Sequence, residues 1–220
     1  MKDNLTGGQL AGGNSKFGRE QNDFYATDPK SVKQLLSVYG LNGNRVLEPC
    51  VGNGSIANAI KEFYGDKVEV TGIDIVDRGY PNTIVKDFLT VDPKEKFDCI
   101  VTNPPYSLAE EFIRHGMDFL GVGGQMCMFL KVQFLEGVGR KKLFDEFPPK
   151  YVYVFRKRAN TLKNGETVNP DTGKPWSTVI CFAWFIWEKG SKTEPIIRWI
   201  DEPVADCGGN KKFDFLSEMG

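Results

Sequence analysis

Histidine is almost absent from this sequence, and cysteine is scarce. His115 is the only histidine among 220 residues, and the five cysteines are widely spaced, with no C-x-x-C pair. Zinc sites need clustered cysteine and histidine ligands, and disulfide frameworks need cysteines that can pair. We therefore expect no metal site and no disulfide, and we interpret the cysteines in apolar runs as small buried hydrophobes.

The sequence also lacks a strong charge of either sign and a long apolar run. Its formal net charge is −1, which excludes a globally basic surface for nucleic acid and leaves room only for a local one. No apolar stretch reaches membrane-spanning length, and the N-terminus has no signal-peptide core. We expect a soluble, cytoplasmic protein with no membrane partner.

What the sequence does contain is a regular alternation of strand-like and helix-like segments. This order is typical of a mostly parallel sheet with helices on both faces. The helices are expected at 30–38, 55–63, 109–119 and 140–147. Seven strands are expected at 45–47, 68–75, 83–85, 97–102, 124–130, 151–155 and 178–187. No helix separates the last two strands, which predicts an antiparallel edge strand, and residues 196–200 are a candidate for one more strand.

Length and composition divide the chain into one domain with two flanking segments. A chain of 220 residues is long enough for one full core and too short for two ordinary domains. Residues 1–22, rich in Gly and Asn, are expected to form a flexible arm, residues 23–200 the folded domain, and residues 201–220 a tail. Within the domain, residues 157–177 form an inserted loop suited to target recognition.

Polar motifs follow several expected strands, at the edge where open parallel sheets bind their ligands. The first runs from Glu48 to Ser55 and contains the glycine loop Gly52-Asn53-Gly54. Glycines let a backbone approach a ligand closely, and the spacing matches neither a dinucleotide fingerprint nor a P-loop. The second motif is Asp74-Ile75, about twenty residues later, where a carboxylate can accept hydrogen bonds from both ribose hydroxyls of a nucleoside.

Two further motifs complete this set. Asp87-Phe88 offers a carboxylate for an exocyclic amine and a ring for the face of an adenine. Asn103-Pro104-Pro105-Tyr106 directly follows an apolar strand and is the most specific motif. Its prolines fix an extended backbone and remove two N–H donors. The Asn103 side-chain oxygen and the Pro104 carbonyl are then left to accept hydrogen bonds from one group, with the flat face of Tyr106 beside them.

These motifs, in this order, resemble those of class I S-adenosylmethionine-dependent N6-adenine DNA methyltransferases, in particular the small enzymes of phages and prophages. The resemblance covers about residues 22–190 and implies a Rossmann-like fold with a mostly parallel, seven-stranded sheet. It implies S-adenosylmethionine as the cofactor and Asn103, Pro104, Pro105 and Tyr106 as the catalytic motif. The cofactor site that it implies consists of Tyr25, Thr27, Glu48, Pro49, Gly52, Gly54, Asp74, Ile75, Asp87, Phe88 and Asn103.

The resemblance also implies a mechanism of methyl transfer to the adenine N6. The Asn103 oxygen and the Pro104 carbonyl would accept hydrogen bonds from the amine and aim its lone pair at the methyl group. The target base would be flipped out of a duplex or lie in a single strand. We expect Tyr106 to stack on one face of this base and Trp176 to stack on the other.

A local excess of basic residues follows the catalytic motif. Nine lysines and arginines stand between residues 131 and 163, against three acidic residues. Phosphate contacts need such a local cluster of positive charge. We expect contacts with DNA from Lys131, Arg156, Lys157 and Arg158, and the alternative is a solvated protein face.

Other activities fit the same motifs. An RNA adenine methyltransferase would use the same site, and the sequence leaves DNA and RNA both open. A protein glutamine methyltransferase also uses Asn-Pro-Pro-Tyr on an amide nitrogen. The basic residues favour a nucleic acid instead, and so does the segment Phe24–Pro29, which resembles the N-terminal F-x-T-P element of the adenine methyltransferases. An inactive binding protein with this fold is disfavoured, because Asn103, Pro104 and Tyr106 are all intact.

Overall fold

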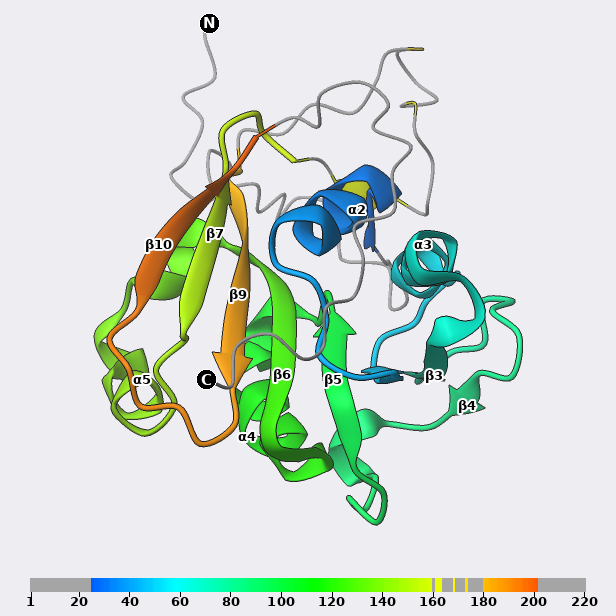
Figure 1. Cartoon of the computed structure of the whole chain (residues 1–220), viewed down its shortest axis with the longest axis horizontal. Helices are drawn as coiled ribbons and strands as arrows, with labels where there is room; N and C mark the ends of the chain where they lie inside the picture. The colour runs from blue at the N-terminus through cyan, green and yellow to red at the C-terminus, as the bar shows by residue number, and fades with distance from the viewer. Residues whose placement is uncertain (1–24, 160, 164–167, 169–172, 174–179, 202–220) are drawn as a thin grey trace, which may run out of the picture.

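The computed structural model describes residues 25–159, 161–163, 168, 173 and 180–201. Eight strands form the central sheet: β2 (Arg45–Glu48), β3 (Glu69–Asp74), β4 (Ile84–Val85), β5 (Phe97–Thr102), β6 (Leu120–Lys131), β7 (Tyr151–Phe155), β9 (Phe182–Glu188) and β10 (Ile196–Ile200). Their order across the sheet is β10-β7-β9-β6-β5-β2-β3-β4 (Figure 1). Neighbouring strands are parallel, except where they pair with β9.

The position of β9 corrects one sequence-based expectation. This strand lies between β6 and β7 and is antiparallel to both, so the antiparallel strand is internal, and β10 and β4 form the edges. The sheet has eight strands instead of seven because residues 196–200 add β10. Residues Phe182–Trp187 of β9 are all buried, and a strand that is apolar on both faces belongs in the interior of a covered sheet.

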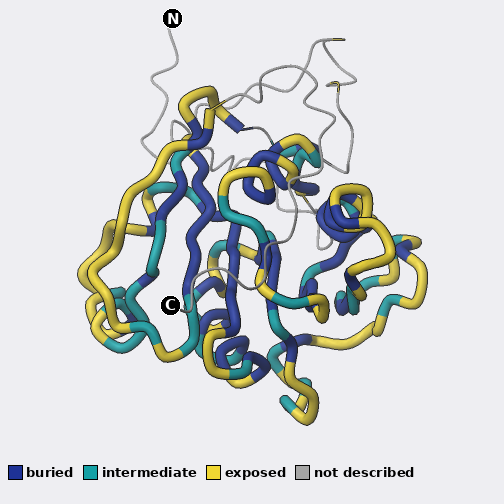
Figure 2. Tube along the Cα trace, in the orientation of Figure 1, coloured by how far each residue is buried: buried dark blue, intermediate teal, exposed yellow. Residues whose placement is uncertain are grey.

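Helices cover both faces of the sheet, as the alternating pattern predicted (Figure 1). On one face, α2 (Pro29–Val38) and α3 (Ser55–Tyr64) share an apolar core with the sheet. On the other, α4 (Ala109–Phe119) and α5 (Lys141–Glu146) do the same. The central strands between these layers are buried over most of their length (Figure 2). All four helices begin and end within one residue of the predicted positions, because each carries apolar residues at helical spacing.

A separate two-stranded sheet joins the N-terminal motif to the insertion. β1 (Tyr25–Thr27) pairs antiparallel with β8 (Thr161–Lys163), with Tyr25 opposite Lys163 and Thr27 opposite Thr161. Residues 161–163 therefore form a strand in a segment that we expected to be a loop. Residues 1–22 and 202–220 and most of the remaining insertion lie outside the described residues, so the arm, the tail and the recognition loop stay predictions.

The single histidine and the buried cysteines belong to the core. His115 Nε2 lies 3.0 Å from the Val91 carbonyl oxygen, and its ring packs against Phe88 and Phe119. Burial raises the pKa of the Cys99 thiol to about 12 and also raises that of Cys127. Within the described ranges, no three potential ligands gather into a metal-binding group. No helix in this part of the chain has the length and apolarity to cross a membrane.

The glycine loop before α3 is shaped by close packing of the Tyr80 ring. Gly54 has a φ of +83°, and a Cβ on it would lie 2.3 Å from Tyr80 Cδ2. Gly79 has a similar φ of +88°, but a Cβ there would meet nothing within 4 Å. The two positions therefore separate the backbone requirement for glycine from the steric one.

We expect Gly54→Ala to lower the free energy of unfolding by about 2–4 kcal/mol. A left-handed backbone costs a non-glycine residue about 1–2 kcal/mol, and forcing a methyl group against Tyr80 adds about 1–3 kcal/mol. The matched control Gly79→Ala should lose only the first amount. Chemical denaturation of both variants measures the difference, and equal losses would show that Tyr80 is not the reason for glycine at 54.

Candidate functional site

Three of the predicted motifs follow neighbouring parallel strands. β5, β2 and β3 are consecutive in the sheet, so their last residues, Thr102, Glu48 and Asp74, lie at one edge. The Val51 N–H donates to the Ile73 carbonyl at 2.9 Å, and the Gly52 N–H donates to Asp74 Oδ2 at 2.8 Å. The glycine loop and the acidic strand end are therefore in direct contact.

Asp74 and Ile75 present two kinds of surface side by side. The Asp74 carboxylate also accepts the Val76 N–H at Oδ1, at 3.1 Å. Each carboxylate oxygen has a second lone pair, so Asp74 can hold the loop and still accept hydrogen bonds from another molecule. Ile75 is 66% exposed, which is unusual for a large apolar residue next to a buried strand. Together they can bind a group that has hydroxyls beside a flat apolar part.

The motif Asp87-Phe88 fulfils only part of its expectation. Phe88 is 2% exposed, and its ring packs among Phe112, His115 and Phe119. The expectation that this ring lies on an adenine is therefore wrong, because the ring fills the core beneath α4. Asp87 is exposed, and its Oδ1 accepts the Leu89 N–H at 3.0 Å. The carboxylate remains a candidate for the site.

Acidic residues from three motifs influence the pKa of the Cys50 thiol. Burial raises the pKa of the Cys50 thiol, and the acidic groups of Asp74, Glu48 and Asp87 raise this pKa further. The edge of the sheet holds an acidic cluster, which suits a positively charged ligand.

Glu48 is the most buried acidic residue of this cluster. Its side chain is 1% exposed, and burial raises the pKa of its carboxyl well above the usual range. The nearby Asp74 raises this pKa further, and a hydrogen bond with the Ala57 backbone opposes the rise. Its second oxygen, Oε2, has no partner among the described residues.

Other buried side-chain oxygens also lack a hydrogen-bond partner among the described residues. In the part of the chain that the structure describes, no hydrogen-bond partner is found for Thr27 Oγ1, Tyr80 Oη, Thr102 Oγ1 and Tyr106 Oη. Buried polar atoms are nearly always paired. Tyr80 lies outside the predicted motifs, but Glu48 Oε2 and the other three oxygens belong to the motifs or to the residue directly before one, which suits a site that binds a polar ligand.

The segment before α2 lies against the catalytic motif. Asn103 Nδ2 donates to the main-chain oxygen of Tyr25 at 3.0 Å. Asp28 caps α2, since its Oδ1 accepts the Lys30 N–H at 2.9 Å, and Pro29 is the first residue of the helix. Cap and proline together fix where the chain leaves β1, and so position Thr27 next to the site.

Tyr106 lies partly buried behind Asn103. Its ring centroid is 6.1 Å from that of Phe182, and Lys131 Nζ lies 5.1 Å from the same ring. Burial raises the pKa of the Tyr106 hydroxyl, so the phenol stays protonated. Pro104 is buried and Pro105 exposed. Lys131, for which we predict a phosphate contact, lies beside the catalytic motif at the end of β6.

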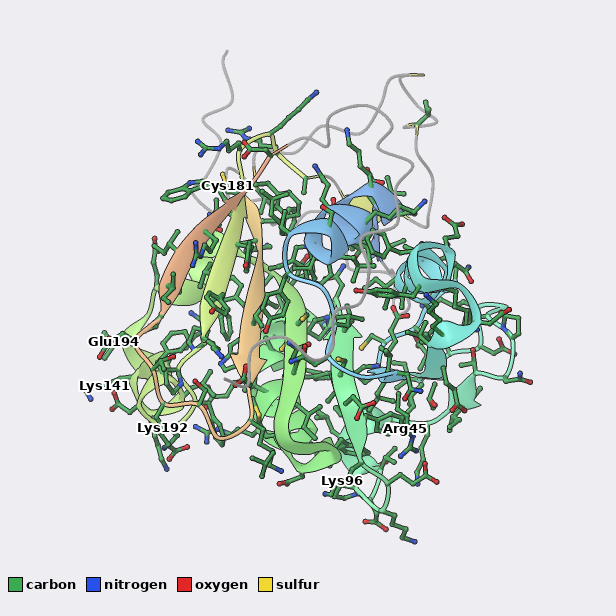
Figure 3. All side chains as sticks on the ribbon, viewed as in Figure 1. Arg45, Lys96, Lys141, Cys181, Lys192 and Glu194 are labelled. Atoms are coloured by element: carbon green, nitrogen blue, oxygen red, sulfur yellow. The ribbon has the colours of Figure 1, made fainter. Side chains whose placement is uncertain are left out.

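The predicted basic residues do not form one surface. Lys141 and Lys142 pair with Asp145 and Glu146 on α5. Figure 3 shows Lys141 at the opposite end of the molecule from Cys181, which directly precedes β9 at the edge of the site. Lys141 and Lys142 therefore do not belong to the candidate site.

Arg156, Lys157 and Arg158 follow the end of β7 at the same sheet edge as the site, and all are exposed. Arg156 pairs with Asp201 at 2.7 Å, and its guanidinium lies 5.6 Å from the ring centroid of Trp199. Trp199 is 54% exposed. Sequence reasoning did not select this tryptophan, although its place near the end of a strand was the available signal. Trp176 lies outside the described residues.

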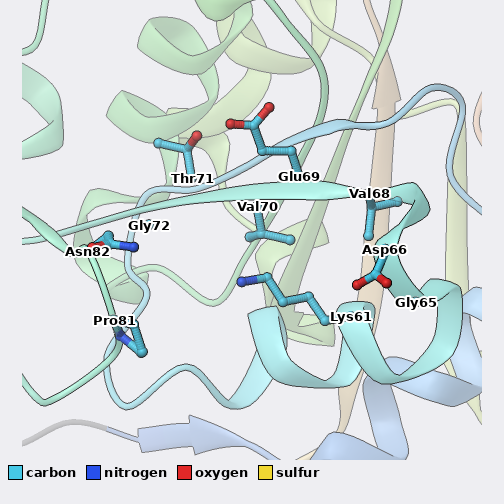
Figure 4. Close-up of a pocket in the computed structure, with 10 residues that line it drawn as sticks. All are labelled: Lys61, Gly65, Asp66, Val68, Glu69, Val70, Thr71, Gly72, Pro81 and Asn82. Carbon is cyan, nitrogen blue, oxygen red and sulfur yellow. The ribbon is translucent and has the colours of Figure 1, made fainter.

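A cavity of about 580 Å³ lies apart from these motifs, between α3 and the first half of β3 (Figure 4). Its charged lining residues are Lys61, Asp66 and Glu69. Glu69 begins β3, whereas Asp74 ends it. The cavity is therefore distinct from the candidate site.

Sequence comparison finds similarity to type II methyltransferases over part of the chain. No protein-family model matches it. A type II methyltransferase of Thermus thermophilus is 32% identical over 120 residues, which are 52% of this chain and 27% of that protein. A type II methyltransferase of Paramecium bursaria Chlorella virus is 26% identical over 46% of this chain and 29% of its own length. The chain thus spans less than a third of the curated relatives that it matches.

Solved structures with a similar fold cover a larger share of the chain than the sequence relatives do. A type I restriction-modification system methyltransferase subunit of Streptococcus thermophilus has a TM-score of 0.56 and 17% identity, and covers 84% of this chain and 49% of that one. A predicted O-methyltransferase of Agrobacterium tumefaciens has a TM-score of 0.55 and 17% identity, and covers 86% and 92%. With its sheet order and two helical layers, the chain has the fold of class I S-adenosylmethionine-dependent methyltransferases.

Proposed function

We propose that this protein transfers a methyl group from S-adenosylmethionine to the N6 amino group of adenine in DNA. The observation that carries the proposal is that Asn103-Pro104-Pro105-Tyr106 ends a strand adjacent to the glycine loop and near Asp74. The similarity to a type II methyltransferase and to a restriction-modification subunit supports DNA as the substrate. Adenine in RNA is the alternative that the same site would accept.

The residues of the site fit the cofactor. S-adenosylmethionine supplies an electrophilic methyl group carried on a positively charged sulfur. Asp74 and Ile75 would hold its ribose and adenine, and Asp87 would accept a hydrogen bond from the adenine amine. Thr27 and Glu48 offer unpaired buried oxygens, which suit the ammonium group of its amino-acid part. The acidic cluster around Cys50 favours the positive charge of the whole ligand.

The chemistry asks little of the protein beyond orientation. An aromatic amine is a weak nucleophile because its lone pair is delocalised into the ring. The Asn103 oxygen and the Pro104 carbonyl would accept its N–H groups and direct the lone pair towards the methyl group. Tyr106, whose raised pKa keeps it neutral, would offer its ring to the base instead of acting as a proton acceptor. A base in a duplex must leave the stack to reach these groups.

Arg156, Lys157 and Arg158 are the proposed contacts with the nucleic-acid backbone. They stand at the end of β7, on the edge that carries the catalytic motif. The exposed ring of Trp199 beside Arg156 adds a surface on which an unpaired base can stack. The substrate would therefore extend from Asn103 across the ends of β6, β7 and β10.

Removal of the Asn103 amide should stop the chemistry without removing the cofactor. We expect Asn103→Ala to lower kcat by about 100-fold or more, as loss of one preorganised hydrogen-bonding group does elsewhere. Affinity for S-adenosylmethionine should change only a few-fold. Mass spectrometry of nucleosides, after incubation with labelled cofactor and DNA or RNA, identifies the product and measures its rate.

Asn42→Ala is the matched control, since Asn42 is exposed and precedes the other end of β2. Wild-type protein that methylates no adenine in DNA or RNA would overturn the proposed function. Normal turnover by Asn103→Ala would remove Asn103 from its catalytic role.

Glu48 should reduce stability at neutral pH. Its folded pKa is raised, whereas the unfolded chain loses this proton near the usual pKa of about 4.3. Between the two pKa values the folded state binds the extra proton, so stability falls as pH rises, by up to about 1.4 kcal/mol per pH unit. We expect Glu48→Gln to be more stable than wild type at pH 7 and to bind S-adenosylmethionine less tightly.

Denaturation at pH 5 and pH 7, with calorimetry of cofactor binding, tests this prediction. Glu62→Gln is the control, because Glu62 is an exposed glutamate of the neighbouring helix α3 and pairs with Lys33. A Glu48→Gln variant whose stability follows that of wild type across this pH range would contradict the buried carboxyl's role.

The basic residues at the end of β7 should contribute to binding without sequence preference. Changing Arg156, Lys157 and Arg158 together to alanine should weaken DNA binding for every sequence. It should also flatten the dependence of log K on log salt by about one unit per lost phosphate contact. Lys141→Ala with Lys142→Ala is the control at the opposite end of the molecule. An unchanged slope in the triple variant would identify this surface as a solvated face.

A further inference from the structure

We propose that the main-chain carbonyl of Tyr25 sets the orientation of the Asn103 amide, and that β8 of the insertion holds this carbonyl in place. The inference rests on the proposed function, because the oriented amide oxygen acts on the substrate amine. It gives the N-terminal segment and the insertion a positioning role in the chemistry.

The starting observation is the hydrogen bond from Asn103 Nδ2 to the Tyr25 oxygen, at 3.0 Å. A carboxamide has donors on one side and an acceptor on the other. If the Asn103 amide were reversed, its oxygen would face the Tyr25 oxygen with no proton between them. The carbonyl therefore selects one of the two orientations and directs Oδ1 away from Tyr25.

An asparagine at this position needs such a selection. Only the amide oxygen can accept a hydrogen bond from a substrate amine, and a reversed amide would present N–H groups to N–H groups. A carboxylate has two equivalent acceptor oxygens, so reversing it would not change which kind of atom faces the substrate. Because the motif here begins with asparagine, half of the amide orientations would be unproductive without a fixed acceptor behind Nδ2.

The carbonyl belongs to a strand that pairs with β8. Tyr25 is the first residue of β1, and the register places it opposite Lys163 of β8. Ala26 and Leu162, the central pair of this two-stranded sheet, are both buried. A movement of the insertion that displaces β8 would therefore displace the group that orients Asn103.

The first experiment is the pH profile of Asn103→Asp. An ionised carboxylate at 103 would face the Tyr25 oxygen without a proton, whereas a protonated carboxyl can donate to Tyr25 and keep its other oxygen for the amine. We expect the turnover of Asn103→Asp relative to wild type to rise by up to about tenfold per pH unit as the pH is lowered. A ratio that is the same at every pH overturns the proposal, whether the variant is active or inactive.

The second experiment tests the role of β8 with a double-mutant cycle. Leu162→Ala should lower kcat several-fold, and the conservative Leu162→Ile should restore most of the turnover. If β8 acts through Asn103, Leu162→Ala will have no further effect in an Asn103→Ala background. An equal loss in both backgrounds would show that β8 has only a structural role.

A spectroscopic measurement separates this inference from the proposed function. If wild-type protein methylates neither DNA nor RNA, the proposed function fails, but the side-chain amide protons of Asn103 still report the orientation. Slow hydrogen exchange of these protons in wild type, with faster exchange in Leu162→Ala, supports the Tyr25 contact. Exchange as fast as that of an exposed asparagine such as Asn42 overturns it.

Discussion

The parallel pairing of β5, β2 and β3 is the constraint on which the candidate site depends. Because the three strands run in one direction, their last residues meet at one edge without any further device. Side chains alternate along a strand, so a shift of one residue in β2 would turn Glu48 to the other face. The register is fixed from within, since Val46 and Leu47 bury on opposite faces of the sheet. The apolar core therefore sets the geometry of the polar edge.

Several buried polar groups at this edge lower the stability of the folded chain. Glu48 is buried with an unpaired oxygen, and Thr27, Thr102 and Tyr106 have buried hydroxyls without described partners. An unpaired buried polar group costs about 1–3 kcal/mol. Two apolar cores, one on each face of the sheet, offset this cost. In the proposed function Thr27 and Glu48 bind the cofactor, so two of these unpaired groups supply affinity.

The sequence predicted the helices, most strands and the meeting of the motifs, because apolar spacing and strand-end motifs are local signals. It was wrong about β9, whose neighbours are decided by pairing across the sheet, although the unbroken apolar run Phe182–Trp187 is typical of an internal strand. The motif Asp87-Phe88 identified two adjacent residues, but the sequence did not predict the direction in which their side chains point. Only packing against Phe112 and His115 turns the Phe88 ring inward. The pairing of β1 with β8 joins segments more than a hundred residues apart, and no local pattern marks it.

The pairing of β1 with β8 has little stability of its own. A two-stranded ribbon of three residues per strand is marginal alone, and β1 and β8 are both of that length. Its stability must therefore come from what packs around it, including whatever contacts the insertion. In the proposed function, a nucleic acid that binds the insertion would tighten β8 on β1 and so fix Tyr25 behind Asn103. Because linkage is reciprocal, an ordered Asn103–Tyr25 contact would also favour substrate binding. Recognition of the substrate and orientation of the catalytic amide would then both depend on the two-stranded sheet of β1 and β8.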